Sequence, residues 1–403
     1  MRLTPRTARI ASLSVLTVVA ACADPVRPEL AGRAVPPTAR AELADPLPLT
    51  LVSGSGAVGT LDPATLFSPT REGTYQSAPI VAGASGYSTI PGTRYVSSDP
   101  SSSGPVNGSV WYRTSFTLPA ACTNLELTVL VHADNAAAVY LNGTKIGEQP
   151  RAQIFPNFQD PAEAYSTRDA ALFLCGATNV LEFELYNFDN PTALDYKAVI
   201  APLLAQAITF TSTPPSPALL GGTYAVTATG GGSGNAVTFS SLTPAVCSVT
   251  GATVNLDAVG LCTIAADQAS GPGYLAAPQA TQSFGVVWPF GGFTSPVSAP
   301  PAMNSAKAGQ AVPLKFSLGA DRGLAILAAG YPVSAPMSCD ASTIASVLDE
   351  TETAGSSTLS YDAVTGLYSY VWKTDKAWAG SCRRLTLRLS DGAEYVASFS
   401  FRR

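Results

Sequence analysis

Alternation of apolar and polar residues with a period of two is the feature that most restricts the fold of this chain. Asn124 to His132 alternates in this way, and so does Asn179 to Tyr186. A period of two places every second side chain on one face, as in a strand buried on one side. Asn142-Gly143 follows the apolar run Val139 to Leu141 and supplies the two positive φ angles of a type I′ hairpin turn. No segment of useful length has the helical period, so the sequence predicts an all-β protein.

The composition supports many short strands joined by turns. Of 403 residues, 46% are hydrophobic, which is enough for packed cores, and 34 are Gly and 32 are Pro. Only 13% are charged, about half the usual share of roughly 25%. The net charge of −5 argues against a nucleic-acid partner, because binding phosphates requires clustered Lys and Arg.

The N-terminus has the layout of an export signal. Arg2, Arg6 and Arg9 form a positive region, an apolar run follows to Val19, and small residues lead to Cys22. The segment V-A-A-C (19–22) resembles the bacterial lipobox, whose cysteine is diacylated and becomes the new N-terminus. Residues 1–21 are therefore expected to be a lipoprotein signal peptide, with lipidation at Cys22. Ordinary signal cleavage after Ala23 remains the alternative.

The rest of the chain is expected to form a tether followed by three modules. Residues 22–49 carry six prolines, a density that opposes both helix and sheet, so they are expected to form an extended spacer. The expected modules are residues 50–204, 205–287 and 288–403, each a β-sandwich. No later segment has the apolar length of a membrane helix.

The remaining cysteines fall two by two into these modules. Seven cysteines leave six once Cys22 is assigned to the lipid. An exported location is oxidising enough for disulfides, and no pair has the short spacing of a metal site. The expected bonds are Cys122–Cys175, Cys247–Cys262 and Cys339–Cys382.

Residues 50–204 contain W-Y-R-T-S-F-T-L-P (111–119) and H-A-D-N-A-A-A-V-Y-L-N-G-T-K-I-G (132–147). These motifs resemble the galactose-binding-like jelly roll. The resemblance implies a sandwich that binds sugars in some families and only packs against neighbours in others.

The two later modules also resemble bacterial exported domains. I-T-F-T-S-T-P-P-S-P (208–217) with C-T-I-A-A-D-Q (262–268) is similar to bacterial immunoglobulin-like repeats. Residues 288–403, with K-A-G-Q-A-V-P-L-K-F-S-L-G (307–319), resemble the PxKF domain, named for the motif at Pro313 to Phe316. That family lies at the C-terminal end of exported bacterial proteins, and membership implies no activity.

The candidate ligand residues lie in the first module. Asp134, Asn135 and Asn142 are candidates for holding a sugar or a structural calcium ion at one edge of the sandwich. Hydrogen bonding to the local backbone explains the same residues without a ligand. No other cofactor and no other metal site is expected.

Four further patterns have an ordinary structural interpretation beside a functional one. Gly54 to Gly59 matches G-x-G-x-x-G but opens no helix, so a glycine turn is expected. Glu182 and Glu184 share one face of a strand and are expected to face solvent, although paired carboxylates can hydrolyse glycosides. The acidic residues of 349–352 are expected to form a hydrated loop. His132, the sole histidine, is expected to be a satisfied strand side chain, so no catalytic residue is assigned.

Together these patterns predict a lipid-anchored protein of the bacterial cell envelope, at the outer membrane or the cell surface. Its expected role is structural or adhesive, with a jelly-roll surface that binds a glycan or another envelope protein. A carbohydrate-active hydrolase and a purely structural spacer are the alternatives. The expected partners are the membrane, through the lipid, and that glycan or protein.

Overall fold

The computed structural model describes residues 47–151, 157–340, 349–353 and 358–403. The predicted signal peptide, the lipidation site Cys22 and nearly all of the tether lie outside these residues. Leu49, at the end of the predicted tether, begins the first strand, and Leu47 packs against the first core. The fold is all-β: within the described residues, two short 3-10 helices accompany the strands.

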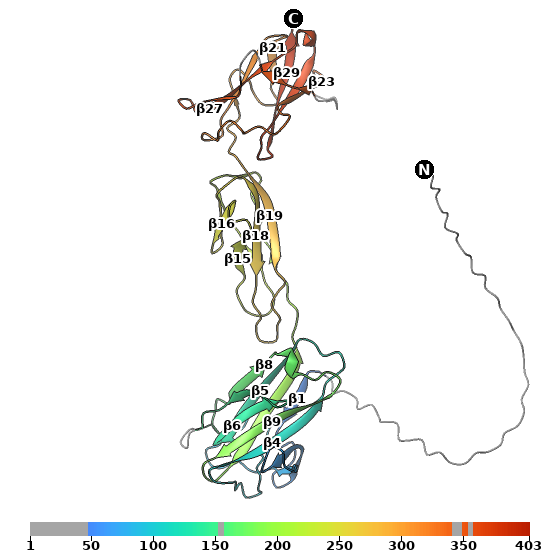
Figure 1. Cartoon of the computed structure of the whole chain (residues 1–403), viewed down its shortest axis with the longest axis vertical. Coiled ribbons are helices and arrows are strands. Elements are labelled where there is room, and N and C mark those ends of the chain that lie inside the picture. The colour runs from blue at the N-terminus through green and yellow to red at the C-terminus, as the bar shows by residue number, and fades with distance from the viewer. Residues whose placement is uncertain (1–46, 152–156, 341–348, 354–357) are drawn as a thin grey trace, which may run out of the picture. The chain divides into compact units, whose positions relative to one another are not determined.

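The first module is a sandwich of a four-stranded and a six-stranded sheet, in the orders β1-β10-β5-β8 and β3-β2-β4-β9-β6-β7 (Figure 1). Its elements are β1 (Leu49–Val52), β2 (Leu61–Ser68), β3 (Gln76–Pro79), β4 (Gly108–Thr117), β5 (Leu125–Asp134), β6 (Ala136–Leu141), β7 (Thr144–Glu148), β8 (Glu163–Thr167), the 3-10 helix η1 (Ala170–Leu172), β9 (Thr178–Asn187) and β10 (Ala193–Pro202).

The alternation seen in the sequence builds the core between these two sheets. On β5 the side chains of Leu127, Val129 and Val131 are fully buried, and on β9 Phe183 stacks on Tyr196 at 4.5 Å between ring centroids. Burying an aliphatic or aromatic side chain of this size contributes about 2 kcal/mol. Because neighbouring strand residues point to opposite faces, the same strands must carry a second, outward row of side chains.

The predicted hairpin at Asn142-Gly143 is confirmed. It joins β6 to β7, with φ of +48° at Asn142 and +85° at Gly143. A glycine has no Cβ to clash at such an angle, and Asn tolerates it better than most residues.

The second module contains three small sheets, ordered β11-β14, β12-β19-β18-β15 and β13-β17-β16. Its strands are β11 (Thr209–Phe210), β12 (Ala218–Leu219), β13 (Thr223–Ala225), β14 (Ala228–Thr229), β15 (Thr238–Ser241), β16 (Cys247–Thr250), β17 (Thr253–Leu256), β18 (Gly260–Asp267) and β19 (Ala280–Val287). Cys247 and Cys262 are fully buried within its apolar core.

The third module contains two five-stranded sheets. Its elements are β20 (Phe293–Thr294), β21 (Met303–Lys307), β22 (Val312–Phe316), β23 (Val333–Met337), β24 (Asp349–Glu350), β25 (Glu352–Thr353), β26 (Ser360–Asp362), β27 (Leu367–Lys373), the 3-10 helix η2 (Lys376–Trp378), β28 (Cys382–Arg388) and β29 (Glu394–Arg402). The motif Pro313 to Phe316 lies on β22, and the fully buried Trp372 packs edge-on to Phe399 at 5.3 Å.

Each of the three expected cysteine pairs lies at disulfide distance. The sulfur atoms are 1.93 Å apart for Cys122–Cys175, 2.02 Å for Cys247–Cys262 and 2.07 Å for Cys339–Cys382. Cys382 is buried, whereas Cys339 is exposed. Within the described ranges, no helix has the length and apolar character needed to cross a membrane.

Candidate recognition face on the first module

The structure does not bring the three predicted ligand residues together. Asp134 ends β5 and Asn135 precedes β6, whereas Asn142 follows the far end of β6. Six strand residues span about 20 Å, so the expectation of one shared edge is corrected.

The polar groups of these residues are used within the fold. Asn142 Nδ2 donates to Leu172 O and Asn179 Oδ1, both at 2.8 Å, and Asn142 Oδ1 accepts from Val180 N. Asn135 Oδ1 accepts from Phe188 N at 2.6 Å. These bonds support the alternative of local hydrogen bonding.

Asp134 is buried and accepts a hydrogen bond from the Tyr87 hydroxyl. Burial raises the pKa of its carboxyl above the ordinary value, and the bond from Tyr87 partly offsets this rise. Its backbone oxygen accepts from Thr192 Oγ1 at 3.0 Å.

The outward face of the six-stranded sheet combines aromatic and charged side chains. β4, β9 and β6 are neighbours (Figure 1), and their register places Arg113, Glu182 and Tyr140 in one cross-strand row. Trp111 and Glu184 lie in the next row. We call this surface the aromatic face; its members are Arg71, Tyr75, Trp111, Arg113, Tyr140, Glu148, Arg151, Glu182, Glu184 and Tyr186.

Arg71, from the turn after β2, contacts and orients the side chains in one half of the aromatic face. Its guanidinium lies 4.8 Å from the Trp111 ring centroid and 4.6 Å from that of Tyr140. Its Nη2 forms an ion pair with Glu182 Oε2 at 2.7 Å, and this contact raises the pKa of Arg71 further. A cation over two rings and against a carboxylate keeps all these planar groups in fixed orientations.

Arg151 orients the side chains in the other half of the aromatic face in the same way. It pairs with Glu148 at 2.9 Å and with Glu184 at 3.1 Å, and its guanidinium lies 5.2 Å from the Tyr186 ring. Glu184 also accepts from Ser109 Oγ at 2.9 Å. Separately, Arg113 stacks at 3.6 Å over Tyr75.

The expectation that Glu182 and Glu184 are freely solvated is corrected. Both point outward from the core, but arginines cover them, and their side chains are only 10% and 18% exposed. Arg71, Tyr75 and Arg151 come from loops, so strand periodicity could not identify them. The sequence signal for this face is that Trp111, Tyr140 and Tyr186 stand at outward strand positions, which polar residues usually occupy.

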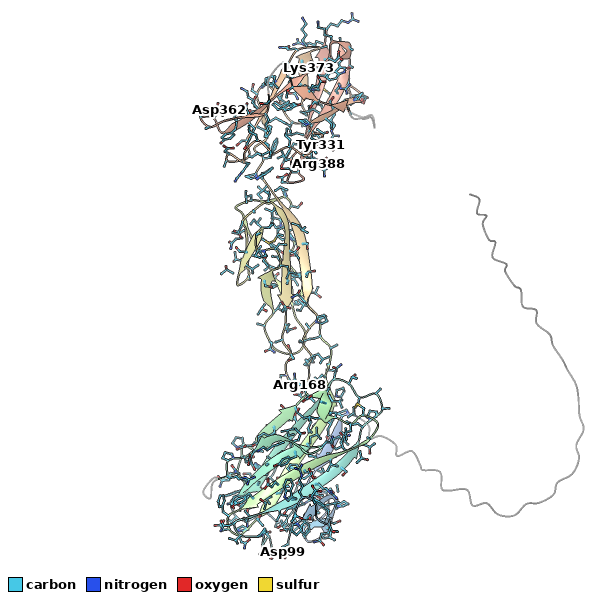
Figure 2. All side chains as sticks on the ribbon, viewed as in Figure 1. Asp99, Arg168, Tyr331, Asp362, Lys373 and Arg388 are labelled. Atoms are coloured by element: carbon cyan, nitrogen blue, oxygen red, sulfur yellow. A yellow bond between two sulfur atoms is a disulfide. The ribbon has the colours of Figure 1, made fainter. Side chains whose placement is uncertain are left out.

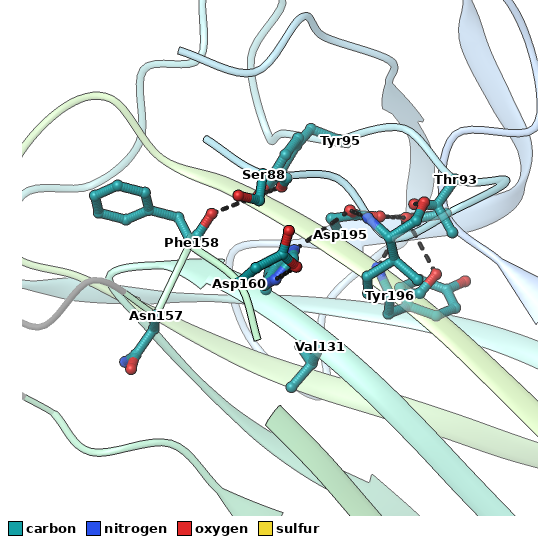
Figure 3. Close-up of polar contacts among 12 residues, drawn as sticks. Ser88, Thr93, Tyr95, Val131, Asn157, Phe158, Asp160, Asp195 and Tyr196 are labelled. Atoms are coloured by element: carbon teal, nitrogen blue, oxygen red, sulfur yellow. Dashed lines mark hydrogen bonds and ion pairs between the residues drawn. The ribbon is translucent and has the colours of Figure 1, made fainter. Parts of the chain in front are cut away.

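His132 also differs from its expectation. The ring is fully buried on the outward side of the four-stranded sheet, and neither ring nitrogen has a hydrogen-bond partner. Figure 3 shows the polar contacts of this region, with Asp195, Asp160 and Tyr95 labelled. The Nδ1 atom lies 3.7 Å from Asp195 Oδ2, and the Nε2 atom lies 3.5 Å from Asp160 Oδ1.

The remaining sequence candidates have ordinary structural roles where they can be described. Gly54 lies in a turn at φ of +61°, and its N–H donates to Asp62 Oδ2 at 2.7 Å. The loop expected for the acidic residues of 349–352 is corrected, because Asp349 and Glu350 form β24 and Glu352 begins β25, where it pairs with Lys373 at 2.7 Å. Among the described residues, no three His, Cys, Asp or Glu side chains lie close enough to share one metal ion.

No protein-family model and no curated protein matches the sequence. Among solved structures, the chain is similar to a β-D-glucuronidase from Dictyoglomus thermophilum at 11% identity and a TM-score of 0.25, covering 63% of this chain and 46% of that one. It is similar to a Bifidobacterium dentium β-glucuronidase at 12% identity and a TM-score of 0.24, covering 88% and 48%.

A C-terminal fragment of intimin, in complex with the intimin-binding domain of its receptor, is a further match. Its identity is 16% and its TM-score 0.17, covering 44% of this chain and 57% of that one. The chain spans less than half the length of the two glucuronidases. Similarity at this level does not establish an activity for this chain.

Proposed function

We infer that this chain is a lipid-anchored protein of the bacterial envelope whose first module recognises a glycan through the aromatic face. The observation that supports this proposal is the fixed array of Trp111, Tyr140 and Tyr186 with arginine and glutamate side chains between them. Aromatic rings offer apolar surfaces for the C–H faces of sugar rings, and planar charged groups pair with neighbouring hydroxyls. The three β-sandwich modules fit a protein that displays such a surface.

Charge balance favours a neutral glycan. The face contains three arginines and three glutamates, Arg71, Arg113, Arg151, Glu148, Glu182 and Glu184. Five of the six are already in ion pairs with one another. A strongly charged ligand would have to break these pairs, whereas a neutral sugar adds hydrogen bonds to them.

The ion pairs also favour recognition over hydrolysis. A glycosidase needs one carboxyl group that donates a proton and a second that attacks or activates water. Glu182 and Glu184 each form an ion pair with an arginine, so that arginine would have to move before either carboxylate could take one of these roles. The hydrolase therefore remains the second candidate, and the ligand-free spacer the third.

A glycan array, run with and without calcium, tests the proposal on the chain carrying Cys22→Ser, which keeps it in solution. We expect binding to neutral glycans without product release. Trp111→Ala should weaken that binding at least about tenfold, because a central aromatic contact commonly contributes more than 1 kcal/mol.

Tyr331→Ala is the matched control. Tyr331 lies 5.8 Å from the Arg388 guanidinium in the third module (Figure 2), so it is a similar pair outside the aromatic face. Equal binding by the Trp111 and Tyr331 variants would refute this face as the site. Released sugar would support the hydrolase, and an array without hits would support the spacer.

Acylation at Cys22 is tested separately. We expect the full chain in a bacterial host to fractionate with membranes and to carry a diacylglyceryl mass on the peptide that begins at Cys22. Cys22→Ser should remove both. An unmodified peptide that begins at Asp24 would instead show ordinary cleavage after Ala23.

A further inference from the structure

Charged and aromatic side chains form the same arrangement twice on the aromatic face. In the first case, Glu182 pairs with Arg71 at 2.7 Å, and the Arg71 guanidinium lies 4.6 Å from the Tyr140 ring centroid. The guanidinium thus joins a carboxylate to an aromatic ring, and all three groups are planar. We call these three residues the Glu182 cluster.

The second arrangement, which we call the Glu184 cluster, consists of Glu184, Arg151 and Tyr186. Glu184 pairs with Arg151 at 3.1 Å, and the Arg151 guanidinium lies 5.2 Å from the Tyr186 ring centroid. Both clusters therefore offer one guanidinium, one carboxylate and one ring. Such a repeat fits a ligand that presents the same groups more than once.

Strand β9 sets the distance between the two clusters. Glu182 and Glu184 are successive outward residues of this strand, so they stand about 7 Å apart. The rings are separated further, because Tyr140 is in register with Glu182, and Tyr186 lies four residues along the strand from that row. Four residues span about 14 Å, which is longer than a single sugar ring.

Trp111 lies between the two clusters. It is in register with Glu184 of one cluster, and its ring centroid lies 4.8 Å from the Arg71 guanidinium of the other. Its ring is therefore positioned to extend the apolar surface from one cluster to the next. The two clusters and Trp111 form one continuous set on the neighbouring strands β4, β9 and β6 (Figure 1).

We propose that the aromatic face binds a linear polysaccharide through internal units of its chain, with separate units over the Glu182 and Glu184 clusters and the chain directed along β9. This inference rests on the proposed function, because it assigns the ligand of the same surface. A repeating polymer presents the same hydroxyl groups and ring faces to each cluster. Once one unit is bound, the chain holds another unit near the second cluster, so affinity increases with chain length.

A site for one terminal sugar would need a different geometry. Small ligands are usually enclosed in a concave pocket, where a few polar groups converge on one position. The two clusters instead stand side by side on outward positions of one sheet, and each has its own carboxylate and guanidinium. This arrangement favours two contacts along one chain over one enclosed chain end.

Affinity measured against chain length tests the inference. The chain carrying Cys22→Ser is titrated with neutral linear oligosaccharides of glucose, galactose, mannose and N-acetylglucosamine, from the monosaccharide to the hexasaccharide. We expect the affinity for at least one series to rise at least about tenfold with length, as for two linked contacts. It should then level off once the oligosaccharide covers both clusters.

Tyr186→Ala removes the ring of one cluster. It should lower the affinity for the hexasaccharide at least about tenfold, and it should lower the affinity for the shortest oligosaccharide that the parent binds by a smaller factor. Tyr331→Ala, in the third module, is again the matched control and should change neither affinity. Tyr186 is partly exposed, so its variant should fold like the parent, which unfolding by heat verifies.

The outcomes separate this inference from the proposed function. Equal affinity for the short and long members of a series that binds would overturn the inference and leave a glycan site for single sugars. An equal loss for short and long oligosaccharides in Tyr186→Ala would overturn it as well. No binding in any series would overturn the proposed site for neutral glycans together with this inference.

Discussion

At the scale of single residues, burial changes the role of polar side chains that the sequence offers as ligands. Asp134 and Asn135 look like a ligand pair, yet both are buried, and their oxygens accept hydrogen bonds from Tyr87 and from Phe188 N. Trp111 and Arg71, by contrast, lie partly exposed at the surface. Partial exposure with a fixed orientation is therefore a better criterion than residue type for choosing candidate recognition residues.

The Asp134 carboxyl gives a prediction about pH. Burial raises its pKa, the Tyr87 hydroxyl lowers it, and the charge of Asp189 raises it. Tyr87→Phe should therefore raise the pKa further, and Asp189→Asn should lower it. Carbon-13 NMR of the Asp134 carboxyl measures both shifts, and a lower pKa in Tyr87→Phe would contradict the assigned cause.

The same shift fixes the sign of a stability effect. A raised pKa in the folded state means that the folded chain binds this proton more tightly than the unfolded chain. The contribution of protonated Asp134 to the free energy of unfolding is fully present below the unfolded pKa of about 3.9. This contribution is lost as the pH rises through the higher pKa of the folded state.

At the scale of elements, the β6–β7 hairpin joins backbone conformation to side-chain bonding. Asn142 adopts a positive φ and also bonds Leu172, Asn179 and Val180. It therefore positions both the turn and the start of β9, whose outward side chains form part of the aromatic face.

Two substitutions separate the effect of the positive φ at Asn142 from the effect of its side-chain hydrogen bonds. Asn142→Gly keeps the favourable backbone and loses the side-chain bonds, so it should lower the free energy of unfolding by about 1–3 kcal/mol. Asn142→Ala adds a left-handed strain of about 1 kcal/mol. Urea unfolding measures the difference in the free energy of unfolding between the two variants. Equal stability of the two variants would show that the positive φ at this position causes no strain.

The sequence predicts the elements better than it predicts the candidate site. Alternation predicts strands β5 and β9, because each has one face in the core. It does not predict the strand Ala280–Val287, since seven of its eight residues are partly or fully exposed. The aromatic face depends on loop residues such as Arg71 and Arg151, whose positions follow from tertiary contacts over more than 30 residues. The local pattern contains no information about such contacts.

At the scale of the whole molecule, each module contains one cysteine pair, but the three pairs differ in exposure. Cys247 and Cys262 are both fully buried, whereas Cys175 and Cys339 are exposed members of their pairs. A reductant attacks a sulfur atom directly, so access to that atom controls the rate of reduction. Exposure should therefore set the order in which the three bonds open in the native protein.

Stepwise reduction under native conditions tests this order. We expect Cys247–Cys262 to be the last bond to open, because both sulfur atoms lie in the core of the second module. Alkylation of the released thiols followed by peptide mass spectrometry assigns each step. Repeating the experiment in denaturant provides the control, since unfolding should abolish the protection. Early labelling of Cys247 and Cys262 in the native chain would show that the second module opens more readily than its burial implies.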